Sequence, residues 1–526
     1  MVKQVAGVFI QSLRGDDAPA SVAQRVRVYR TVLDGVRSGT LRPGTRLPSA
    51  RRLAADCAVS RGAVDEAFEQ LKSEGFIERR VGDGSYVADP LPVLVKPSPA
   101  LERPISAAAQ RVIERFAPHL GQWSRLEVPT ELFALPALHP RNVPTQDFPL
   151  DTWRRLMQRA WSEPYRKHLN YGPSAGLPSL RESIVRHLAL TRGVHCSARQ
   201  VLILNSPMQA LELIARVLLE PGDKVWLEDP GHASLPVLFD VLHAKAVGVP
   251  CDELGFDVAH GRAHAPDARA VYLHPLGQYP LGVRTSRERG AELLAWAERQ
   301  GSWILEGNYN TELVHDGVPP PALHTQDRHG CVLLVGTFEG VLFPSLRIAY
   351  LVVPEHLADT FTAMRGLLGE HAHVATQLAL TAFIDEGHMS AHLHELRQRC
   401  RARRAALQQA VAHHLPHWAT LGPTAEGVHA ALHFPAEVPD VDVFRLIRKQ
   451  GVGATPLSTI CWHARGLNGL ALGYGGADEA IIDGALRVIG QALRNVRAGL
   501  AVSKPAATGQ CAPAAAAVPS ASGASR

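Results

Sequence analysis

The sequence predicts a large α/β domain, with a mostly parallel sheet flanked by helices, preceded by a small α+β N-terminal module. Two observations predict this architecture. Between residues 131 and 497, helical stretches alternate with short apolar runs such as 201–204, 270–273 and 332–335, a pattern typical of buried parallel strands. Residues 21–89 are instead dense in charge and helical periodicity, and end in two strand-like runs around a glycine-containing turn.

Composition assigns the remaining segments of the chain. Residues 90–130 are rich in proline and are expected to form a linker of limited flexibility. Residues 498–526 are rich in Ala, Ser, Pro and Gly without periodicity, so we expect a disordered tail. Residues 1–20 form an N-terminal extension. At 526 residues and 46% hydrophobic content, the chain can bury a sizeable core.

Charge and cysteine usage narrow the class of protein. A net charge of +5 is mild for this length, but basic residues gather between 21 and 80, in a local excess that a phosphate backbone would attract. The 7 cysteines are scattered without a CxxC pair, which favours reduced thiols over a disulfide framework. No apolar stretch is long enough to cross a bilayer. We therefore expect a soluble, cytoplasmic protein.

The N-terminal module carries the signals of a helix-turn-helix. A first helix is expected over 22–38, where apolar residues share one face. Ser49 is placed to cap a second helix over 50–57, and Ser60 to cap a third over 61–74. Two short helices joined by a tight turn are typical of a motif whose second helix enters the major groove by its N-terminus.

A β-hairpin is expected after the third helix. Residues 76–80 and 85–88 bracket a tip that contains Gly82 and Gly84, and glycine accepts the backbone conformations that tight turns require. The hairpin would form the wing of a winged helix-turn-helix.

Residues 21–89 resemble the GntR-type winged helix. The resemblance is carried by Leu47-Pro48-Ser49, Val59-Ser60-Arg61, Leu71-x-x-Glu74-Gly75 and Gly82-x-Gly84. It implies binding to double-stranded operator DNA, with Arg51 and Arg61 on bases or phosphates, Gly62 allowing close approach, and the wing tip in the minor groove. The alternative is a solvated basic face. The implied interface comprises Ser49, Arg51, Ser60, Arg61, Gly62, Arg80, Gly82 and Gly84.

Residues 131–497 resemble the aminotransferase-like domain of the MocR subfamily of GntR regulators, a fold-type I pyridoxal phosphate (PLP) fold. Motifs that carry the resemblance are Tyr171-Gly172-x-x-Ala175-Gly176-Leu177, Pro221-Gly222-Asp223, Gln278-Tyr279-Pro280 and Leu342-Phe343-Pro344-x-Leu346-Arg347. The resemblance implies PLP as the family's cofactor, a head-to-tail homodimer, and the possibility of a small-molecule effector.

Several positions depart from the family pattern. Gly340 occupies the place of the lysine that holds PLP covalently, and no lysine occurs between Lys245 and Lys449. Gly307 stands where an acid would pair with the pyridine nitrogen. The segment that should form the phosphate cup reads Asn205-Ser206-Pro207, and proline offers no N–H. His232 replaces an expected aromatic residue, and Ala471 replaces an arginine that often holds a substrate carboxylate.

Other parts of the pocket are retained. Tyr309 could bond a ring hydroxyl, Arg347 could meet a phosphate bidentately, and Gln278 lies where the family has a ring-facing amide. Each also has a purely structural interpretation, with Tyr309 packed under a strand and Arg347 paired with a buried acid such as Glu306 or Glu339.

The hypothesis from the sequence is a DNA-binding transcriptional regulator, with no catalytic residues, no metal site and no covalent PLP. Its aminotransferase-like domain would serve dimerisation, with effector sensing as a further role. Two alternatives stay open: a PLP-dependent aminotransferase-type enzyme, and a sensor that binds PLP or a PLP adduct noncovalently.

Overall fold

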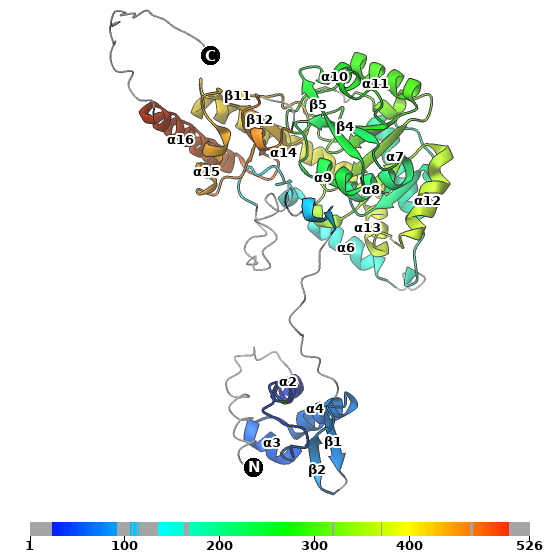
Figure 1. Cartoon of the computed structure of the whole chain (residues 1–526), viewed down its shortest axis with the longest axis vertical. Coiled ribbons are helices and arrows are strands. Elements are labelled where there is room, and N and C mark those ends of the chain that lie inside the picture. Colours follow the sequence, from blue (N-terminus) through cyan, green and yellow to red (C-terminus); the bar gives the residue numbers. More distant parts are fainter. Residues whose placement is uncertain are drawn as a thin grey trace, which may run out of the picture. The chain divides into compact units, whose positions relative to one another are not determined.

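The computed structural model describes residues 24–91, short pieces between 106 and 114, and residues 135–503, apart from 81, 163–167, 318–319, 370 and 463–465. The chain divides into two compact units, Met1–Pro104 and Ile105–Arg526 (Figure 1). The extension predicted over 1–20 and most of the tail predicted from 498 lie outside the described residues.

The N-terminal unit is built from helices and one hairpin, as the sequence predicts. Its core packs Val32 of the first helix against Phe68 and Leu71 of the third, with Ile77 and Val87 of the hairpin closing the cluster. The strands pair antiparallel, with Ile77 opposite Val87. Its elements are α2 Gln24–Arg37, α3 Ala50–Cys57, α4 Arg61–Ser73, β1 Ile77–Arg80 and β2 Gly84–Val87.

The second unit is organised around an eight-stranded sheet of order β3-β10-β9-β8-β7-β4-β5-β6. The pairs β5–β4, β4–β7, β7–β8 and β8–β9 are parallel, whereas β10 and β6 run antiparallel to their neighbours. The strands are β3 Val201–Leu204, β4 Lys224–Asp229, β5 Lys245–Asp252, β6 Gly255–Phe256, β7 Ala270–Leu273, β8 Trp303–Asn308, β9 Val332–Thr337 and β10 Ala349–Val352.

Helices cover both faces of this sheet. Side chains alternate along β3, so that Val201 and Ile203 belong to a core cluster that includes residues of the helices 178–192, 374–385 and 388–414, whereas Leu202 and Leu204 belong to a second cluster that includes residues of the helices 207–218, 234–241 and 358–367. This burial of both faces explains the continuous apolar runs in the sequence. The helices are α6 Leu150–Ala160, α7 Pro178–Arg192, α8 Pro207–Leu218, α9 Ser234–Val241, α10 Val258–His264, α11 Arg287–Gln300, α12 Ala358–Leu367, α13 Val374–Asp385 and α14 His388–His414.

A smaller antiparallel sheet of order β11-β12-β14-β13 follows, with α15 packed against it and α16 packed on α14 and α15. None of the helices described is both long and apolar enough to span a membrane. The elements are β11 Thr420–Leu421, β12 His429–His433, α15 Asp440–Arg448, β13 Thr455–Pro456, β14 Gly469–Gly473 and α16 Glu479–Ser503.

Two boundaries differ from the sequence prediction. Helix α16 continues beyond residue 497 to Ser503, because Ala498, Leu500 and Ala501 favour helix and the next proline is Pro505. The predicted linker over 90–130 is not uniform either, because residues 109–112 are helical and Arg111 Nε lies 2.6 Å from Asp240 Oδ2 on α9.

Candidate functional site

The two helices of the predicted helix-turn-helix are fixed by side-chain caps. Ser49 Oγ accepts a hydrogen bond from Arg52 N at 3.3 Å, and Ser60 Oγ accepts one from Ala63 N at 3.2 Å. The Ser60 amide also donates to Gln24 Oε1 on α2 at 2.8 Å. The turn between the helices uses Ala58 in the left-handed region, with φ of 52°. The N-terminus of α4 is therefore held rigidly.

The N-terminus of α4 presents an open, basic surface. The Arg61 side chain is 72% exposed, and its Nε lies 3.5 Å from Asp65 Oδ2 on the same helix. Arg51 is exposed on α3. A Cβ added at Gly62 would meet no heavy atom within 4 Å, so the missing side chain clears the outer surface of the helix. Close approach of a large partner is thus possible here.

The hairpin has the geometry of a wing. Gly82 adopts φ of 77° and Gly84 φ of 130°, conformations that other residues rarely adopt. Arg80 lies with its guanidinium carbon 4.3 Å from the centre of the Tyr86 ring and donates to Glu78 at 2.6 Å. Backbone bonds from Leu47 N to Ser85 O and from Val87 N to Thr45 O join the hairpin to the segment before α3.

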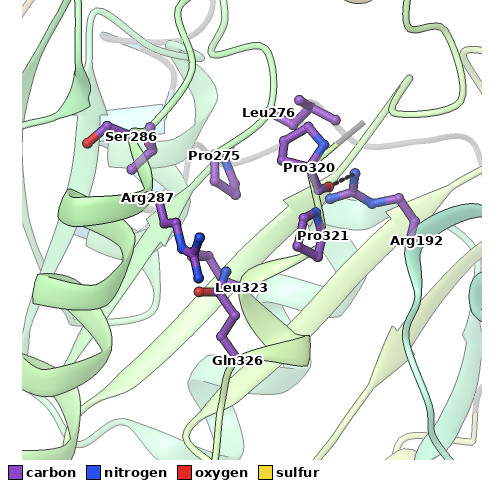
Figure 2. Close-up of a pocket in the computed structure, with 10 residues that line it drawn as sticks. Arg192, Pro275, Leu276, Ser286, Arg287, Pro320, Pro321, Leu323 and Gln326 are labelled. Carbon is purple, nitrogen blue, oxygen red and sulfur yellow. Dashed lines mark hydrogen bonds between the residues drawn. The ribbon is translucent and has the colours of Figure 1, made fainter. Parts of the chain in front are cut away.

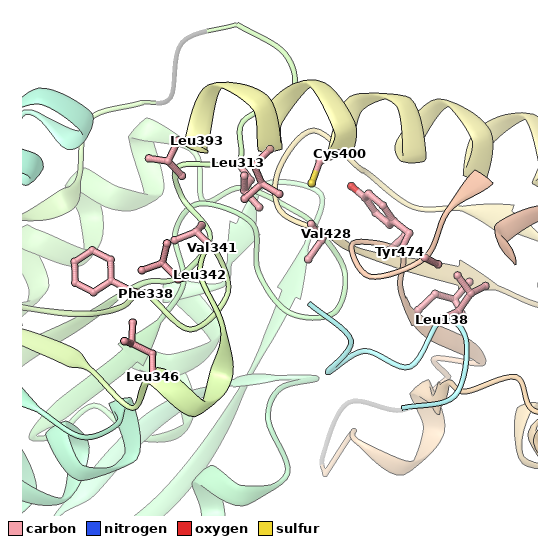
Figure 3. Packing of buried hydrophobic residues seen from close by; sticks show 14 of the residues in the cluster. Leu138, Leu313, Phe338, Val341, Leu342, Leu346, Leu393, Cys400, Val428 and Tyr474 are labelled. Carbon is pink, nitrogen blue, oxygen red and sulfur yellow. The ribbon is translucent and has the colours of Figure 1, made fainter. Parts of the chain in front are cut away.

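The predicted cofactor-pocket residues lie in the second unit, most of them at or just after strand ends. Gly340 follows β9, in a loop held on both sides by the buried side chains of Phe338, Val341 and Leu342 (Figure 3). A Cβ at Gly340 would lie 2.8 Å from Asn310 Cγ and closer still to Asn310 Oδ1. Asn310 therefore fills the space next to Gly340.

Gly307, near the end of β8, has a comparable neighbour. A Cβ there would lie 2.6 Å from His274 Nε2 and closer still to His274 Cδ2. Asn308, the next residue, points its amide to the Tyr350 hydroxyl at 2.8 Å and accepts from Thr311 Oγ1. Glu306, the carboxylate of β8, accepts hydrogen bonds from the backbone amides of Leu323 and His324. Strand β8 therefore offers no carboxylate to pair with the nitrogen of a pyridine ring.

His274 belongs to a buried chain of polar side chains. Its Nδ1 lies 2.9 Å from Glu228 Oε2, and its backbone amide donates to Glu228 Oε1 at 2.9 Å. Its Nε2 lies 3.1 Å from the Tyr272 hydroxyl, which donates to the Tyr309 hydroxyl at 2.8 Å. Burial raises the pKa of Tyr309 and that of Tyr272 well above their ordinary value. Tyr309 is thus bonded within the protein.

Arg347 is paired with an acid of the same loop. Its Nη1 lies 3.1 Å from Glu339 Oε1, and Glu339 directly precedes Gly340. Burial raises the pKa of Glu339, while the charges of Arg347 and Arg141 oppose that shift. The guanidinium that could hold a phosphate therefore already has a carboxylate partner, in agreement with the structural interpretation.

The N-terminus of α8 is capped by its own residues. Ser206 Oγ accepts from Gln209 N at 3.2 Å, and Gln209 Oε1 accepts from Asn205 N at 2.7 Å. Pro207 begins the helix and has no N–H. Amides that a phosphate would need are thus used inside the protein.

His232 and Gln278 are committed to structural contacts as well. The His232 ring is exposed on one side and stacks on Tyr279 on the other, with centroids 4.4 Å apart, and partial desolvation together with the charges of His274, His429 and Arg141 lowers its pKa. Gln278 Nε2 donates to Pro230 O and to Tyr279 O, each at 2.6 Å. Ala471 packs in an apolar cluster, so the side chains around it offer no anchor for a carboxylate.

As they stand, these residues do not fit PLP. There is no amine at position 340, the ring-facing position of β8 contacts His274, and the retained arginine faces Glu339. Sequence reasoning located the positions but missed their occupants, His274 and Asn310. One signal was available, because Glu228 and His274 end adjacent parallel strands β4 and β7, whose carboxyl ends meet at one edge of the sheet.

A separate cavity of about 310 Å³ lies beside this region, lined by residues that follow β7, begin α11 or precede β9 (Figure 2). None of the predicted pocket residues lines it. Its buried arginine, Arg192, donates to Pro320 O at 3.1 Å and lies 3.7 Å from Glu306 Oε1. The buried positive charge of this cavity is therefore already paired.

Comparison with protein families supports both units. The model of bacterial regulatory proteins of the gntR family matches residues 24–87, and that of aminotransferase class I and II matches residues 142–461. Among solved structures, a kynurenine aminotransferase from Pyrococcus horikoshii is 23% identical with a TM-score of 0.64, covering 74% of this chain and 99% of that chain. This likeness shows the fold of the second unit.

Relatives of nearly full length share both parts. The chain is 32% identical to the probable rhizopine catabolism regulatory protein MocR of Rhizobium meliloti, over 88% of this chain and 92% of that protein. It is 31% identical to the pyridoxine biosynthesis transcriptional regulator PdxR of Corynebacterium glutamicum, over 87% and 93%. The transcriptional regulator TauR of Rhodobacter capsulatus is 28% identical, over 89% and 96%.

Proposed function

The chain belongs to the MocR-type regulators of the GntR family, and from this premise we propose that it regulates transcription by binding operator DNA through α3, α4 and the β1–β2 wing. The observation that carries the proposal is the surface at the N-terminus of α4. There the Ser60 cap fixes the helix, Arg61 is 72% exposed, and the absent side chain of Gly62 clears the helix surface. These are the requirements for a helix that reads a major groove.

The wing supports the same proposal. Arg80 and the glycines Gly82 and Gly84 lie on the hairpin that follows α4, and the backbone bonds to residues 45–47 make helix and wing one body. A rigid helix and wing bind DNA with less loss of conformational freedom than mobile ones would. We propose that the protein acts in the cytoplasm, where its operator DNA lies.

The test is a titration of a labelled fragment from the protein's own upstream region. Affinity should fall steeply with salt, with a slope of about −0.9 for each phosphate contacted. Arg61→Gln should weaken binding about tenfold or more, since a specific arginine contact contributes about 1–3 kcal/mol. Arg216→Gln, a surface change on α8 far along the chain, is the matched control. Binding that ignores both salt and Arg61 would refute the proposal.

The second unit, on this proposal, is a structural and regulatory domain and performs no transamination. What supports this is the set of contacts at the cofactor-like positions: Gly340 beside Asn310, Arg347 on Glu339, and Gln209 on the Asn205 amide. PLP belongs to the family by resemblance only. The sequence position of the covalent lysine carries glycine, and an amine is required for covalent attachment.

We also propose that the second unit forms a homodimer. Large apolar side chains are exposed near the end of α6 and the end of α12, with Trp161 at 54%, Leu169 at 69%, Tyr171 at 93% and Leu367 at 81%. These segments are neighbours, because Trp161 packs on His373 and a Cβ at Gly366 would lie 3.2 Å from Ser174 Oγ. Exposed apolar groups gathered in one place are typical of an interface. A second copy would present two winged helices to two half-sites.

A further inference from the structure

Gly307 and Gly340 share an unusual relation to their surroundings. Neither has a positive φ, so the backbone conformation of neither position requires glycine. What excludes a side chain is one particular neighbour in each case, His274 at Gly307 and Asn310 at Gly340. Each glycine therefore makes room for a specific polar side chain.

His274 is held by side-chain hydrogen bonds, and Asn310 by the backbone conformation of its turn. His274 is fixed by Glu228 on one side and Tyr272 on the other, within a region where each of these residues is at most 6% exposed. Asn310 adopts φ of 56°, a left-handed conformation that asparagine tolerates better than most residues. Moving the His274 side chain would break buried hydrogen bonds.

From these contacts we infer that the His274 side chain occupies the space of a side chain at position 307, and that the Asn310 side chain occupies the space of one at position 340. The protein's own residues thereby close this pocket. Glu339 completes the arrangement by placing a carboxylate where Arg347 would meet a phosphate. The pocket then takes no pyridoxal ring, whether attached covalently or not. This inference rests on the proposal that the second unit performs no transamination, and it is independent of DNA binding.

The inference predicts specific couplings between positions. Gly340→Ala should lower the thermal unfolding midpoint of the full chain by about 2–5 °C through overpacking. The same change should have little effect in an Asn310→Gly background, where the obstructing amide is gone and φ stays acceptable. Gly307→Ala should likewise be destabilising alone and much less so beside His274→Ala. Double-mutant cycles on purified protein measure both couplings.

Gly484→Ala is the matched control, because a Cβ at this glycine of α16 would meet nothing within 4 Å. It should leave the midpoint unchanged or raise it, since alanine favours helix. The inference is wrong if Gly340→Ala and Gly307→Ala leave the unfolding midpoint as this control does. It is also wrong if the effect of Gly340→Ala is the same with and without Asn310→Gly, and that of Gly307→Ala the same with and without His274→Ala.

A chemical readout tests the same idea. PLP is added to wild type and to Gly340→Lys, followed by borohydride reduction and mass-spectrometric mapping of the adduct. We expect no adduct at position 340 in Gly340→Lys, because Asn310 excludes the new side chain. An adduct at that position without a change at Asn310 would overturn the inference. DNA binding, measured on the same samples, reports separately on the regulator proposal.

Discussion

His232 stacks its ring on the half-buried Tyr279 and is otherwise exposed to solvent. Partial desolvation of the stacked ring lowers its pKa, and the nearby His274, His429 and Arg141 add to the effect. Unfolding returns the pKa to its ordinary value near 6.5. As the pH falls below 6.5, the unfolded chain therefore binds a proton at this histidine more readily than the folded chain does, so stability falls with the pH.

This shift gives a prediction for acid stability. The free energy of unfolding should fall as the pH goes below 6.5, but by only a fraction of the about 1.4 kcal/mol per pH unit that a fully buried histidine would contribute, because His232 is exposed and solvent screens it. His232→Phe keeps a ring against Tyr279 and should reduce the slope, whereas His195→Gln, at an exposed position, should not. Denaturant unfolding at several pH values measures it. Equal slopes in wild type and His232→Phe would contradict the assignment.

The sequence predicted which pocket positions had changed, but not which neighbouring side chains fill the space beside them. The replacements at 307 and 340 are read directly from the sequence, given the family resemblance. Asn310 and His274 became visible only in three dimensions, because each acts on a glycine some thirty residues away in the sequence. The pairing of Arg347 with Glu339, in contrast, is one of the two that the sequence suggests, because Arg347 and Glu339 lie in one short loop.

At the scale of elements, the cap residues predicted where the helices of the N-terminal unit begin. Ser49 and Ser60 are visible as caps because a serine precedes each apolar helical stretch, and the structure confirms both starts. Helix ends differ from the prediction, since α4 ends at Ser73 instead of residue 74 and α16 extends to Ser503 beyond residue 497. Such ends depend on tertiary packing, which local sequence signals do not contain.

The Ser60 cap gives a second prediction. Ser60→Ala removes the acceptor for Ala63 N and should destabilise the N-terminal unit by about 1 kcal/mol. Because the cap orients the helix that would enter the groove, DNA affinity should fall as well. Ser60→Thr keeps the hydroxyl and should restore most of both properties. Circular dichroism melting and DNA titration measure them, and an Ala variant that behaves like wild type would contradict this role.

At the scale of the whole molecule, self-association should depend on the exposed apolar segments. Tyr171→Asp or Leu367→Asp should shift the dimer toward monomer and weaken binding to a two-half-site fragment, because a charge would be buried in the interface. Leu254→Asp, at another exposed leucine, is the control. Light scattering after size exclusion gives the mass. Unchanged dimers in both variants would place the interface elsewhere.

The two-unit organisation was the most predictable feature, because composition and periodicity change sharply between residues 89 and 131. The structure refined it by assigning residues from Ile105 onward to the second unit, with Arg111 bonded to Asp240. A single ion pair of this kind leaves no periodic trace in a proline-rich stretch, so sequence patterns do not reveal it.

The most direct test of the central claim is one titration of upstream DNA with the full chain, performed with and without excess PLP and followed by fluorescence anisotropy. A regulator whose pocket is closed by its own side chains should bind DNA in a salt-sensitive manner, with the same Kd in both conditions. A Kd that shifts several-fold with PLP would contradict the account, because a ligand changes an equilibrium only through differential binding to its states.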